Sequence, residues 1–405
     1  MVGRKRTFVL LLSLSLTVPS ASTVFGDDFN LTPLVAVRGE FNDNLFFTST
    51  DETDDFISTI TGGLDLTERT ERLDAILQAR LDGRIYADND DLDALDQFYR
   101  GSVGYQVNPR LGLAAEASFK RDSRPDRDVL ETGLVLSTKK RNRQFYAVSM
   151  DYDLSEITST SLSYSFERDD WEDPRLTDSD THAAYLGFSR DMSDVLLASI
   201  GRANVGYEHY SSPNLDVDNL ALTLGGTWAV SEKFRIQLDV GPRFTHSRFI
   251  VSRLGDLAGS GLQPVTEQRT SDTWGGTVDL ALTYSGEFTS ATLRAYSRLA
   301  PVSGSTAVSQ RTSAVFTVGH RLAHNVTANL SGGYYLNEAS QGETSTRDID
   351  TQTVYVSPWV RYEVTRYLNL EASYGYTTVD NRETGNESHR NRVMFLLRYQ
   401  QPIFN

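Results

Sequence analysis

The sequence contains no cysteine among its 405 residues. Disulfide frameworks and thiolate-ligated metal sites are therefore excluded, so the fold must be held by hydrogen bonding and packing. Basic residues are scarce as well, with 39 against 54 acidic ones and a formal net charge of −15. This balance argues against a nucleic-acid-binding protein.

Long apolar runs are missing from most of the chain. The one candidate, residues 8–18, follows three basic residues and reaches only about half of the roughly 20 residues that a membrane-spanning helix needs. This pattern predicts a secretory signal peptide over residues 1–26, with cleavage after Ser22 as the alternative, and a mature domain over residues 27–405. No later window approaches about 18 apolar residues, so a helical membrane protein is excluded.

The chain is rich in alternation between apolar and polar residues. Over residues 219–230, and again over residues 234–244 after a polar triplet, nearly every second residue is apolar. The apolar set is Leu220, Leu222, Leu224, Trp228, Val230, Phe234, Ile236, Leu238, Val240 and Phe244. Because side chains alternate between the two faces of a strand, this stretch predicts an antiparallel hairpin with one apolar and one polar face.

The hairpin pattern repeats along the mature chain. Eight short polar connections separate the alternating stretches, at residues 68–70, 108–109, 155–158, 193–194, 231–233, 285–287, 323–325 and 365–367. Longer polar segments lie between them, at residues 88–96, 169–179, 250–270, 337–350 and 380–389. Eight turns between nine hairpins predict about 18 strands, or 16 if a weak strand near residues 159–166 or 195–207 is miscounted. Residues 129–138 alternate poorly, and we assign them to a long external loop within residues 121–142.

Short turns at one end and long loops at the other are typical of outer-membrane barrels. A soluble β-sandwich or β-solenoid would show the same alternation, but the strands are too many for one sandwich and aromatic residues gather near the strand ends. Those near the short turns are Tyr105, Tyr152, Trp228, Phe234, Tyr284 and Tyr362, and those near the long loops are Phe56, Tyr210, Phe244, Trp274, Tyr334 and Tyr376. Two such rings predict aromatic girdles at the two membrane interfaces.

We therefore expect an all-β fold, a transmembrane antiparallel up-and-down β-barrel in the cell outer membrane of a Gram-negative bacterium. Its short turns would be periplasmic and its long loops extracellular. The last stretch, residues 393–399, alternates in the same way and precedes Phe404, which is typical of the strand that the barrel assembly machinery reads. The expected partners are that machinery, outer-membrane lipids and lipopolysaccharide.

The polar face of the strands is rich in arginine. On this face the basic residues slightly outnumber the acidic ones, although acidic residues dominate the chain as a whole. We expect these residues to line a pore: Arg80, Arg84, Arg100, Arg235, Asp239, Arg243, Asp279, Arg294, Arg298, Arg361 and Glu371. Arginines that face water would favour anionic cargo, because guanidinium groups fork onto carboxylates, sulfates or phosphates. The alternative is that these charges pair across strands and rigidify the wall.

No catalytic, cofactor or metal site is expected. The six histidines lie in no recognisable Ser-His-Asp signature, and no HExxH or paired metal-ligand spacing occurs. An outer-membrane lipase or protease whose triad is assembled from distant strands is the enzymatic alternative. The acidic clusters at residues 51–55, 88–93 and 169–173 either bind divalent cations that bridge lipopolysaccharide or are simply solvated, and the cluster at Asp88 lacks the spacing of a calcium loop.

A short motif after the first strand carries a family resemblance. Residues 40–46, Glu-Phe-Asn-Asp-Asn-Leu-Phe, resemble the aromatic-Asn/Asp-Asp-Asn-aliphatic-Phe pattern of the β-barrel porin type 2 family. Members of that family often accompany exopolysaccharide or exosortase-type surface systems. The resemblance implies a porin-like channel for polar solutes or for export of an exopolysaccharide, with polysaccharide export components as further partners.

The width of an 18-strand barrel also bears on this hypothesis. Such a barrel leaves an aqueous channel unless something fills it. Since the strands begin about ten residues after the predicted cleavage site, we expect no separate plug domain, and residues 250–270 are the candidate for an inward-folded constriction. A structural or surface-binding barrel with a closed lumen is the competing hypothesis.

Overall fold

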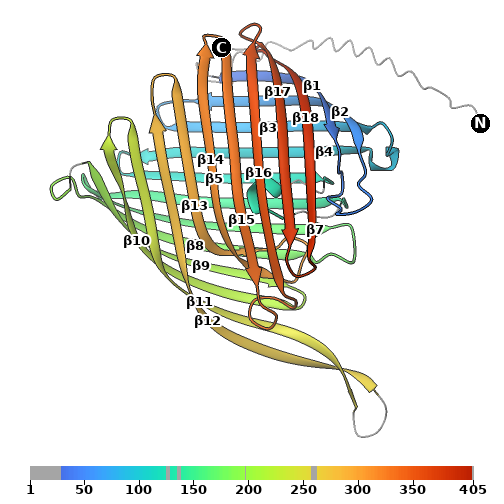
Figure 1. The fold of residues 1–405 in the computed structure, drawn as a ribbon. Coiled ribbons are helices and arrows are strands. Elements are labelled where there is room, and N and C mark those ends of the chain that lie inside the picture. Colours follow the sequence, from blue (N-terminus) through green and yellow to red (C-terminus); the bar gives the residue numbers. More distant parts are fainter. Residues whose placement is uncertain (1–28, 125–127, 135–137, 197, 257–261, 404–405) are drawn as a thin grey trace, which may run out of the picture.

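The chain folds into one closed antiparallel sheet of 18 strands. The computed structural model describes residues 29–124, 128–134, 138–196, 198–256 and 262–403 (Figure 1). The strands are β1 (Phe29–Asn42), β2 (Asp55–Arg69), β3 (Leu73–Tyr86), β4 (Ala94–Asn108), β5 (Leu111–Asp122), β6 (Arg141–Ser155), β7 (Thr158–Trp171), β8 (Ser179–Asp191), β9 (Ser199–Ser212), β10 (Leu215–Ser231), β11 (Phe234–Asp256), β12 (Leu262–Ser285), β13 (Thr289–Pro301), β14 (Val308–Ala323), β15 (Val326–Ala339), β16 (Ile349–Glu363), β17 (Leu368–Asn381) and β18 (Asn386–Gln400). Each strand pairs with its neighbours in sequence, and β18 returns to β1 in a register that runs from Leu34–Gln400 to Asn42–Arg392. The predicted barrel is confirmed, with 18 strands rather than 16.

The connections at the two ends of the barrel divide as the sequence predicts. The eight expected turns, from β2–β3 to β16–β17, all lie at one end, which we call the turn end. The opposite end, the loop end, carries the longer connections such as β1–β2, β5–β6 and β15–β16. Two short helices lie in these loops, η1 (Asp90–Leu92) and α1 (Val129–Thr132). Residues 129–134 and 138 are therefore not a strand, as expected.

Two further expectations concern the N-terminus and helical spans. The predicted signal peptide, residues 1–26, lies outside the described residues. Within the described part of the chain, no helix has the length and apolarity needed to cross a membrane.

The apolar side of each strand faces outward. Leu77, Leu81 and Ile85 of β3 and Leu220, Leu222 and Leu224 of β10 are all exposed large hydrophobic side chains, as the alternation predicts. Residues of the opposite parity face inward: Glu40 of β1, for example, accepts a hydrogen bond from Arg124, which lies beyond the end of β5. An apolar belt of this extent around a barrel is stable only in lipid.

The aromatic residues near the strand ends are mostly placed as expected. Tyr105, Tyr152, Trp228, Tyr284 and Tyr362 near the turn end, and Phe56 and Trp274 near the loop end, all remain exposed. Tyr210 is the exception, and its assignment to a girdle is wrong. It lies on the inward parity of β9, is only 4% exposed, and donates a hydrogen bond from its hydroxyl to the Ser305 carbonyl at 3.1 Å.

Strands β11 and β12 form a long hairpin that leaves the barrel wall. They stay paired from Phe234–Tyr284 to Asp256–Leu262, and Figure 1 shows this hairpin projecting away from the other loops. The expected inward fold of residues 250–270 is therefore wrong for the described residues. The polarity of this stretch misled the expectation, because both faces of a two-stranded ribbon outside the membrane meet water and polar residues there do not disfavour pairing.

The departure of the hairpin leaves a short seam in the wall. Strand β12 pairs with β13 only between Val278–Ser297 and Ser285–Ser290. Toward the loop end from this seam, contacts between side chains replace the backbone hydrogen bonds. One apolar cluster there contains Tyr210, Leu215, Val217, Phe249, Leu299 and Val308. Arg243 passes close to Gly275, where a Cβ would lie 2.4 Å from its guanidinium, and donates to Gln310 at 2.7 Å. The wall therefore stays continuous where the backbone ladder ends.

The facing of the strands predicts a matched pair of substitutions. Leu224 is 62% exposed on the outer face, whereas Gln237 lies on the inward parity of β11. Leu224→Arg should lower the free energy of unfolding by roughly 2–4 kcal/mol, because it places a charge in lipid, and Gln237→Arg should be tolerated. Urea unfolding in lipid vesicles measures both. Equal effects of the two substitutions would contradict the assignment of the faces.

Candidate functional site

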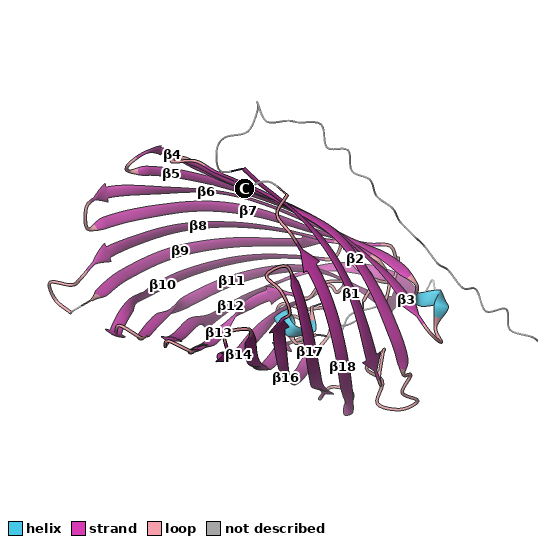
Figure 2. Cartoon of the chain, turned by 90° about the horizontal axis from the view of Figure 1, so that it is seen from above, coloured by secondary structure: helices cyan, strands magenta, loops and turns pink. Residues whose placement is uncertain are grey.

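The segment between β5 and β6 enters the barrel instead of lying outside it. We call residues 123–134, as far as the structure describes them, the inner segment. Its helix α1 lies inside the ring of strands when the barrel is viewed from above (Figure 2). The helix ends at Thr132 and is capped by Gly133, which has a φ of 69° and donates to the Val129 carbonyl at 2.9 Å. The expectation that this segment is external is therefore wrong: it begins at the loop end but folds inward.

The far end of the inner segment is fixed to strands on the opposite side of the lumen. Asn337 of β15 donates to the Thr132 carbonyl at 2.8 Å, and the Thr353 hydroxyl of β16 donates to the Gly133 carbonyl. Position 133 tolerates only glycine, because a Cβ there would lie 2.3 Å from the Tyr335 Cβ and the backbone is left-handed. The inner segment therefore crosses the lumen from β5–β6 to β15–β16.

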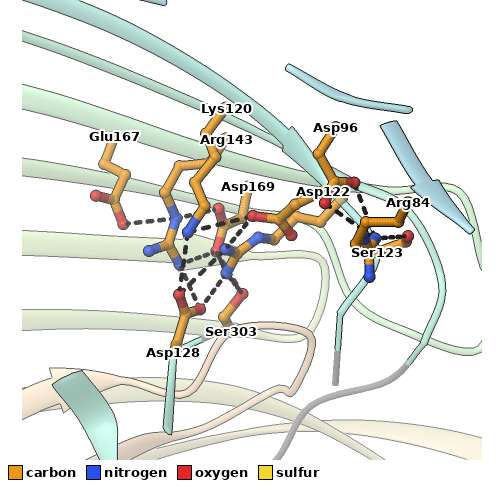
Figure 3. Close-up of polar contacts among 11 residues, drawn as sticks. Arg84, Asp96, Lys120, Asp122, Ser123, Asp128, Arg143, Glu167, Asp169 and Ser303 are labelled. Atoms are coloured by element: carbon orange, nitrogen blue, oxygen red, sulfur yellow. Dashed lines mark hydrogen bonds and ion pairs between the residues drawn. The ribbon is translucent and has the colours of Figure 1, made fainter. Parts of the chain in front are cut away.

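The near end of the inner segment is fixed by a buried ion-pair network around Asp128 (Figure 3). Asp128 is 1% exposed and accepts from Arg141 at 2.5 Å, with Lys120 at 3.7 Å and Arg143 at 3.8 Å. Arg141 is fully buried and lies over the Trp171 ring at 5.7 Å. A buried carboxylate with three cations around it is compensated, whereas removing one partner of a buried pair costs roughly 3–5 kcal/mol.

The same network includes a second loop. Arg143 donates from Nε and Nη2 to the two carboxylate oxygens of Asp169 of β7, both at 2.7 Å, and the Ser303 hydroxyl donates to the oxygen that also accepts from Nη2. Ser303 belongs to the β13–β14 loop, which also bridges to Thr177 through Gly304. The inner segment and the β13–β14 loop therefore both bind to charged side chains of β6 and β7, through Asp128 and Ser303 respectively.

An apolar cluster completes the contact between the loops. Leu134 of the inner segment packs with Val302 and Ala307 of the β13–β14 loop, and Ile349 of β16 lies against them. The β15–β16 loop joins through a bridge between Ala307 and Ser345. Three loops thus meet inside the loop end and narrow it.

The motif at residues 40–46 has a structural role in this arrangement. Glu40 is 1% exposed and pairs with Arg124 of the inner segment at 2.9 Å. Asp43 accepts from Asn391 of β18 at 2.7 Å, and Asn44 donates to the His389 carbonyl at 2.9 Å. The motif therefore fastens the closing junction of the barrel, and it positions one end of the inner segment.

The predicted pore-lining residues all lie on the inward parity of their strands, and they fall into two groups. The paired group comprises Arg84 with Asp96 at 2.9 Å, Arg100 with Glu116 at 2.9 Å, Asp239 with Arg202 at 2.5 Å, and Arg361 with Glu371 at 2.8 Å. The group without an ion pair among the described residues comprises Arg80, Arg235, Arg243, Asp279, Arg294 and Arg298. Pairing across strands, the second alternative drawn from the sequence, is therefore found for part of the set only. Whether these residues line a conducting pore stays a prediction.

The central ion pairs of the inner segment were not found from the sequence. Arg141 and Arg143 begin β6 with the two-residue spacing of one strand face, which is a usable signal for a charged inner wall. Asp128 carries no local signal, because its role depends on a fold that brings β5, β6 and β7 together. No group of three His, Asp or Glu side chains within the described residues is arranged to hold a metal ion.

A cavity of about 400 Å³ lies beside the inner segment. Asp128, Arg143 and Asp169 border it on one side, and Arg298 and Arg311 on the other. This volume falls in the range of roughly 300–1,000 Å³ that is usual for small-molecule sites. The narrowed loop end therefore contains space for a ligand with charged surroundings.

The comparison with known families agrees with this geometry. Residues 285–401 match the family model described as Putative beta-barrel porin 2. The resemblance drawn from residues 40–46 is thereby confirmed by a separate region, which begins at the end of β12 and includes β13 to β18. The protein is a porin-like β-barrel of the outer membrane. No curated protein matches the sequence.

Solved structures share the architecture at low identity. OccAB4 of Acinetobacter baumannii is 10% identical, with 93% of this chain and 98% of that chain covered and a TM-score of 0.48. OccK2 (OpdF) of Pseudomonas aeruginosa is 8% identical, with 94% and 99% covered and a TM-score of 0.47. The open form of the ferric-catecholate import receptor Fiu of E. coli K12 is 8% identical, with 93% and 82% covered and a TM-score of 0.49.

The charge network predicts how the inner segment responds to acid. Burial alone would raise the pKa of Asp128, but the positive charges of Arg143, Arg141 and Lys120 outweigh it and lower this pKa to about 2. An aspartate in the unfolded chain has a pKa of about 3.9. The stabilisation is therefore complete above about pH 4 and is lost as the pH falls through about 2.

We expect the conductance of single barrels in planar bilayers to stay constant from neutral pH to about pH 4 and to rise below it. Asp128→Asn should show the raised conductance already at neutral pH, because it removes the carboxylate that the three cations surround. A conductance that changes between pH 7 and pH 5 would show that another group fixes the segment.

Proposed function

We propose that this protein is a channel for polar solutes whose loop end is narrowed by the inner segment. The observation that carries the proposal is solvent exposure on the inward parity of the wall. Arg80, Arg235, Arg294 and Arg298 point inward, yet each remains exposed and has no ion pair among the described residues. A guanidinium in that position needs water or a ligand, because an unpaired charge is too costly to leave in a dry interior.

The exposed arginines support a preference for anionic cargo. The guanidinium group stays charged at any physiological pH and binds carboxylate, sulfate or phosphate groups through two parallel hydrogen bonds. Elsewhere on the wall, Arg100, Arg202 and Arg361 are neutralised by carboxylates. The exposed arginines without an ion pair therefore lie on β3 and, on the opposite arc of the closed sheet, on β11 and β13, which would give the lumen two positively charged patches.

Export of an acidic exopolysaccharide is the specific form of this function that we favour. The family resemblance supports it, and so does a charged wall suited to a flexible acidic chain. In this proposal the turn end faces the periplasm and polysaccharide export components, and the loop end faces lipopolysaccharide outside the cell. The lumen acts by passage and binding, with no catalytic step.

A structural barrel with a closed lumen is the competing function. The buried ion pairs of Asp128 and Arg141 favour it, since they hold the inner segment across the lumen. The two functions differ in one property: a channel conducts more when the inner segment is removed, and a structural barrel loses stability without conducting.

The chain permits a well-matched test of this difference. Asp122 and Arg141 are register partners at the ends of β5 and β6, so an Asn-Gly turn can replace residues 123–140. Ile250 and Gln268 are register partners in the projecting hairpin, so the same turn can replace residues 251–267 as a control of similar length. We expect the first variant to conduct several-fold more than the unaltered protein in planar bilayers, and the control to conduct like the unaltered protein. A folded first variant that does not conduct would favour the structural barrel.

Ion selectivity tests the anionic preference separately. Combined Arg80→Gln, Arg235→Gln and Arg294→Gln substitutions should bring the ratio of anion to cation permeability down toward one, because they remove uncompensated positive charge. The control is the double variant Arg361→Gln with Glu371→Gln, which removes an ion pair without changing the net charge of the wall. Reversal potentials in a salt gradient give the ratio. If both variants shift it alike, the exposed arginines do not set selectivity.

A further inference from the structure

A tyrosine in the lumen lies flat against the barrel wall. Tyr185 of β8 points inward and is paired in register with Gly206 of β9. A Cβ at position 206 would lie 2.8 Å from both Cδ1 and Cε1 of the Tyr185 ring, so the glycine is what allows the ring to lie over β9. Tyr185 as a whole remains 42% exposed, so its side chain can contact a ligand in the lumen.

The carboxylate of Glu208 holds this ring in place. The Tyr185 hydroxyl donates to one oxygen of Glu208, and Asn219 donates to the other oxygen at 3.2 Å. Among the described residues no Lys, Arg or His forms an ion pair with Glu208. A carboxylate held in this way is a strong acceptor for hydroxyl groups.

Two arginines face the same cavity from the other side. Arg298 of β13 and Arg311 of β14 are direct register partners, so two positive charges lie opposite each other. Arg311 is buried and donates to Asn337 at 3.0 Å, whereas Arg298 is exposed and lies over the Tyr296 ring at 4.8 Å. Tyr185, Glu208, Tyr296 and Arg298 all line the cavity of about 400 Å³ described above.

From this arrangement we infer a binding site for an acidic sugar unit, a hexuronic acid residue of an oligosaccharide. Its carboxylate binds Arg298, its hydroxyl groups donate to Glu208, and the face of its ring packs on Tyr185. A small inorganic anion fits the arrangement less well, because Glu208 would repel it. The site requires a ligand that carries an anionic group at one edge and hydroxyl groups at another, and it assigns a ligand class to the proposed channel.

Binding can be measured without conduction, so the test does not depend on passage through the lumen. The folded full-length barrel in detergent micelles is titrated by calorimetry with trigalacturonate, with the neutral trisaccharide maltotriose, and with inorganic phosphate. We expect trigalacturonate to bind at least about tenfold more tightly than either other probe, which is the range for a charged hydrogen-bonded pair.

Three variants assign the binding to these side chains. Arg298→Gln should weaken trigalacturonate binding by about tenfold or more and remove its advantage over maltotriose. Tyr185→Leu should weaken binding of both saccharides. Arg321→Gln is the matched control, since Arg321 is an exposed arginine on the same parity of β14 as Arg311, near the turn end, and does not line the cavity, so it should leave binding unchanged.

The outcomes separate this inference from the proposed function. Phosphate that binds as tightly as trigalacturonate, equal effects of the two arginine substitutions, or no saccharide binding by a heat-modifiable, folded barrel would each overturn the sugar site. A barrel that binds trigalacturonate as expected but never conducts would leave the site standing and refute the channel.

Discussion

Closure of the backbone hydrogen-bond ladder is the constraint on which the rest of this structure depends. In hydrocarbon an unpaired backbone N–H or C=O costs several kcal/mol, so a sheet that spans a membrane has to leave no edge. Here β18 meets β1, and Asp43 and Asn44 fasten the junction through Asn391 and the His389 carbonyl. The least continuous part of the ladder is between β12 and β13, where an apolar cluster and Arg243 continue the wall.

Closure with 18 strands creates a second problem, because a ring of this size encloses more space than its own side chains fill. At the loop end, the inner segment and the β13–β14 and β15–β16 loops occupy part of this space. The inner segment carries Asp128 into a position where charge is costly, and Arg141, Arg143 and Lys120 compensate it. Arg80 of β3, Arg235 of β11, and Arg294 and Arg298 of β13 form no ion pair among the described residues. The division between compensated and uncompensated charge is what connects the fold to the proposed passage and binding of acidic solutes.

The fold could be predicted from the sequence because its information is local. The alternation at Leu220, Leu222 and Leu224 predicts which face of β10 points toward lipid. The turn at residues 231–233 predicts that β10 pairs with the strand that follows, β11. The same parity places Arg235 and Glu371 inside. Nearness to a strand end is a weaker criterion than parity, as Tyr210 shows. Its position near a strand end predicts a girdle residue, whereas its parity predicts an inward side chain, and the inward position is the one observed.

The inner segment could not be predicted in the same way. Residues 129–138 lack alternation, which correctly excludes a strand but does not distinguish a loop outside the barrel from one inside it. The contacts of Asp128 with Arg141, and of Thr132 with Asn337, join residues that only the closed barrel brings together. The packing of the Tyr185 ring over Gly206 likewise depends on the register between β8 and β9. Such non-local contacts leave no periodic signal in the chain.

A cross-link across the lumen tests the position of the inner segment most directly. Leu134 and Ile349 lie in one apolar cluster, and the chain has no cysteine of its own, so Leu134→Cys with Ile349→Cys gives a clean pair. With a short bismaleimide, the folded barrel should yield a cross-linked peptide from this pair and none from Leu134→Cys with Ile250→Cys on the projecting hairpin. Failure of the first pair to cross-link in a folded barrel, with both thiols labelled freely by a large maleimide, would contradict an inner segment that crosses the lumen.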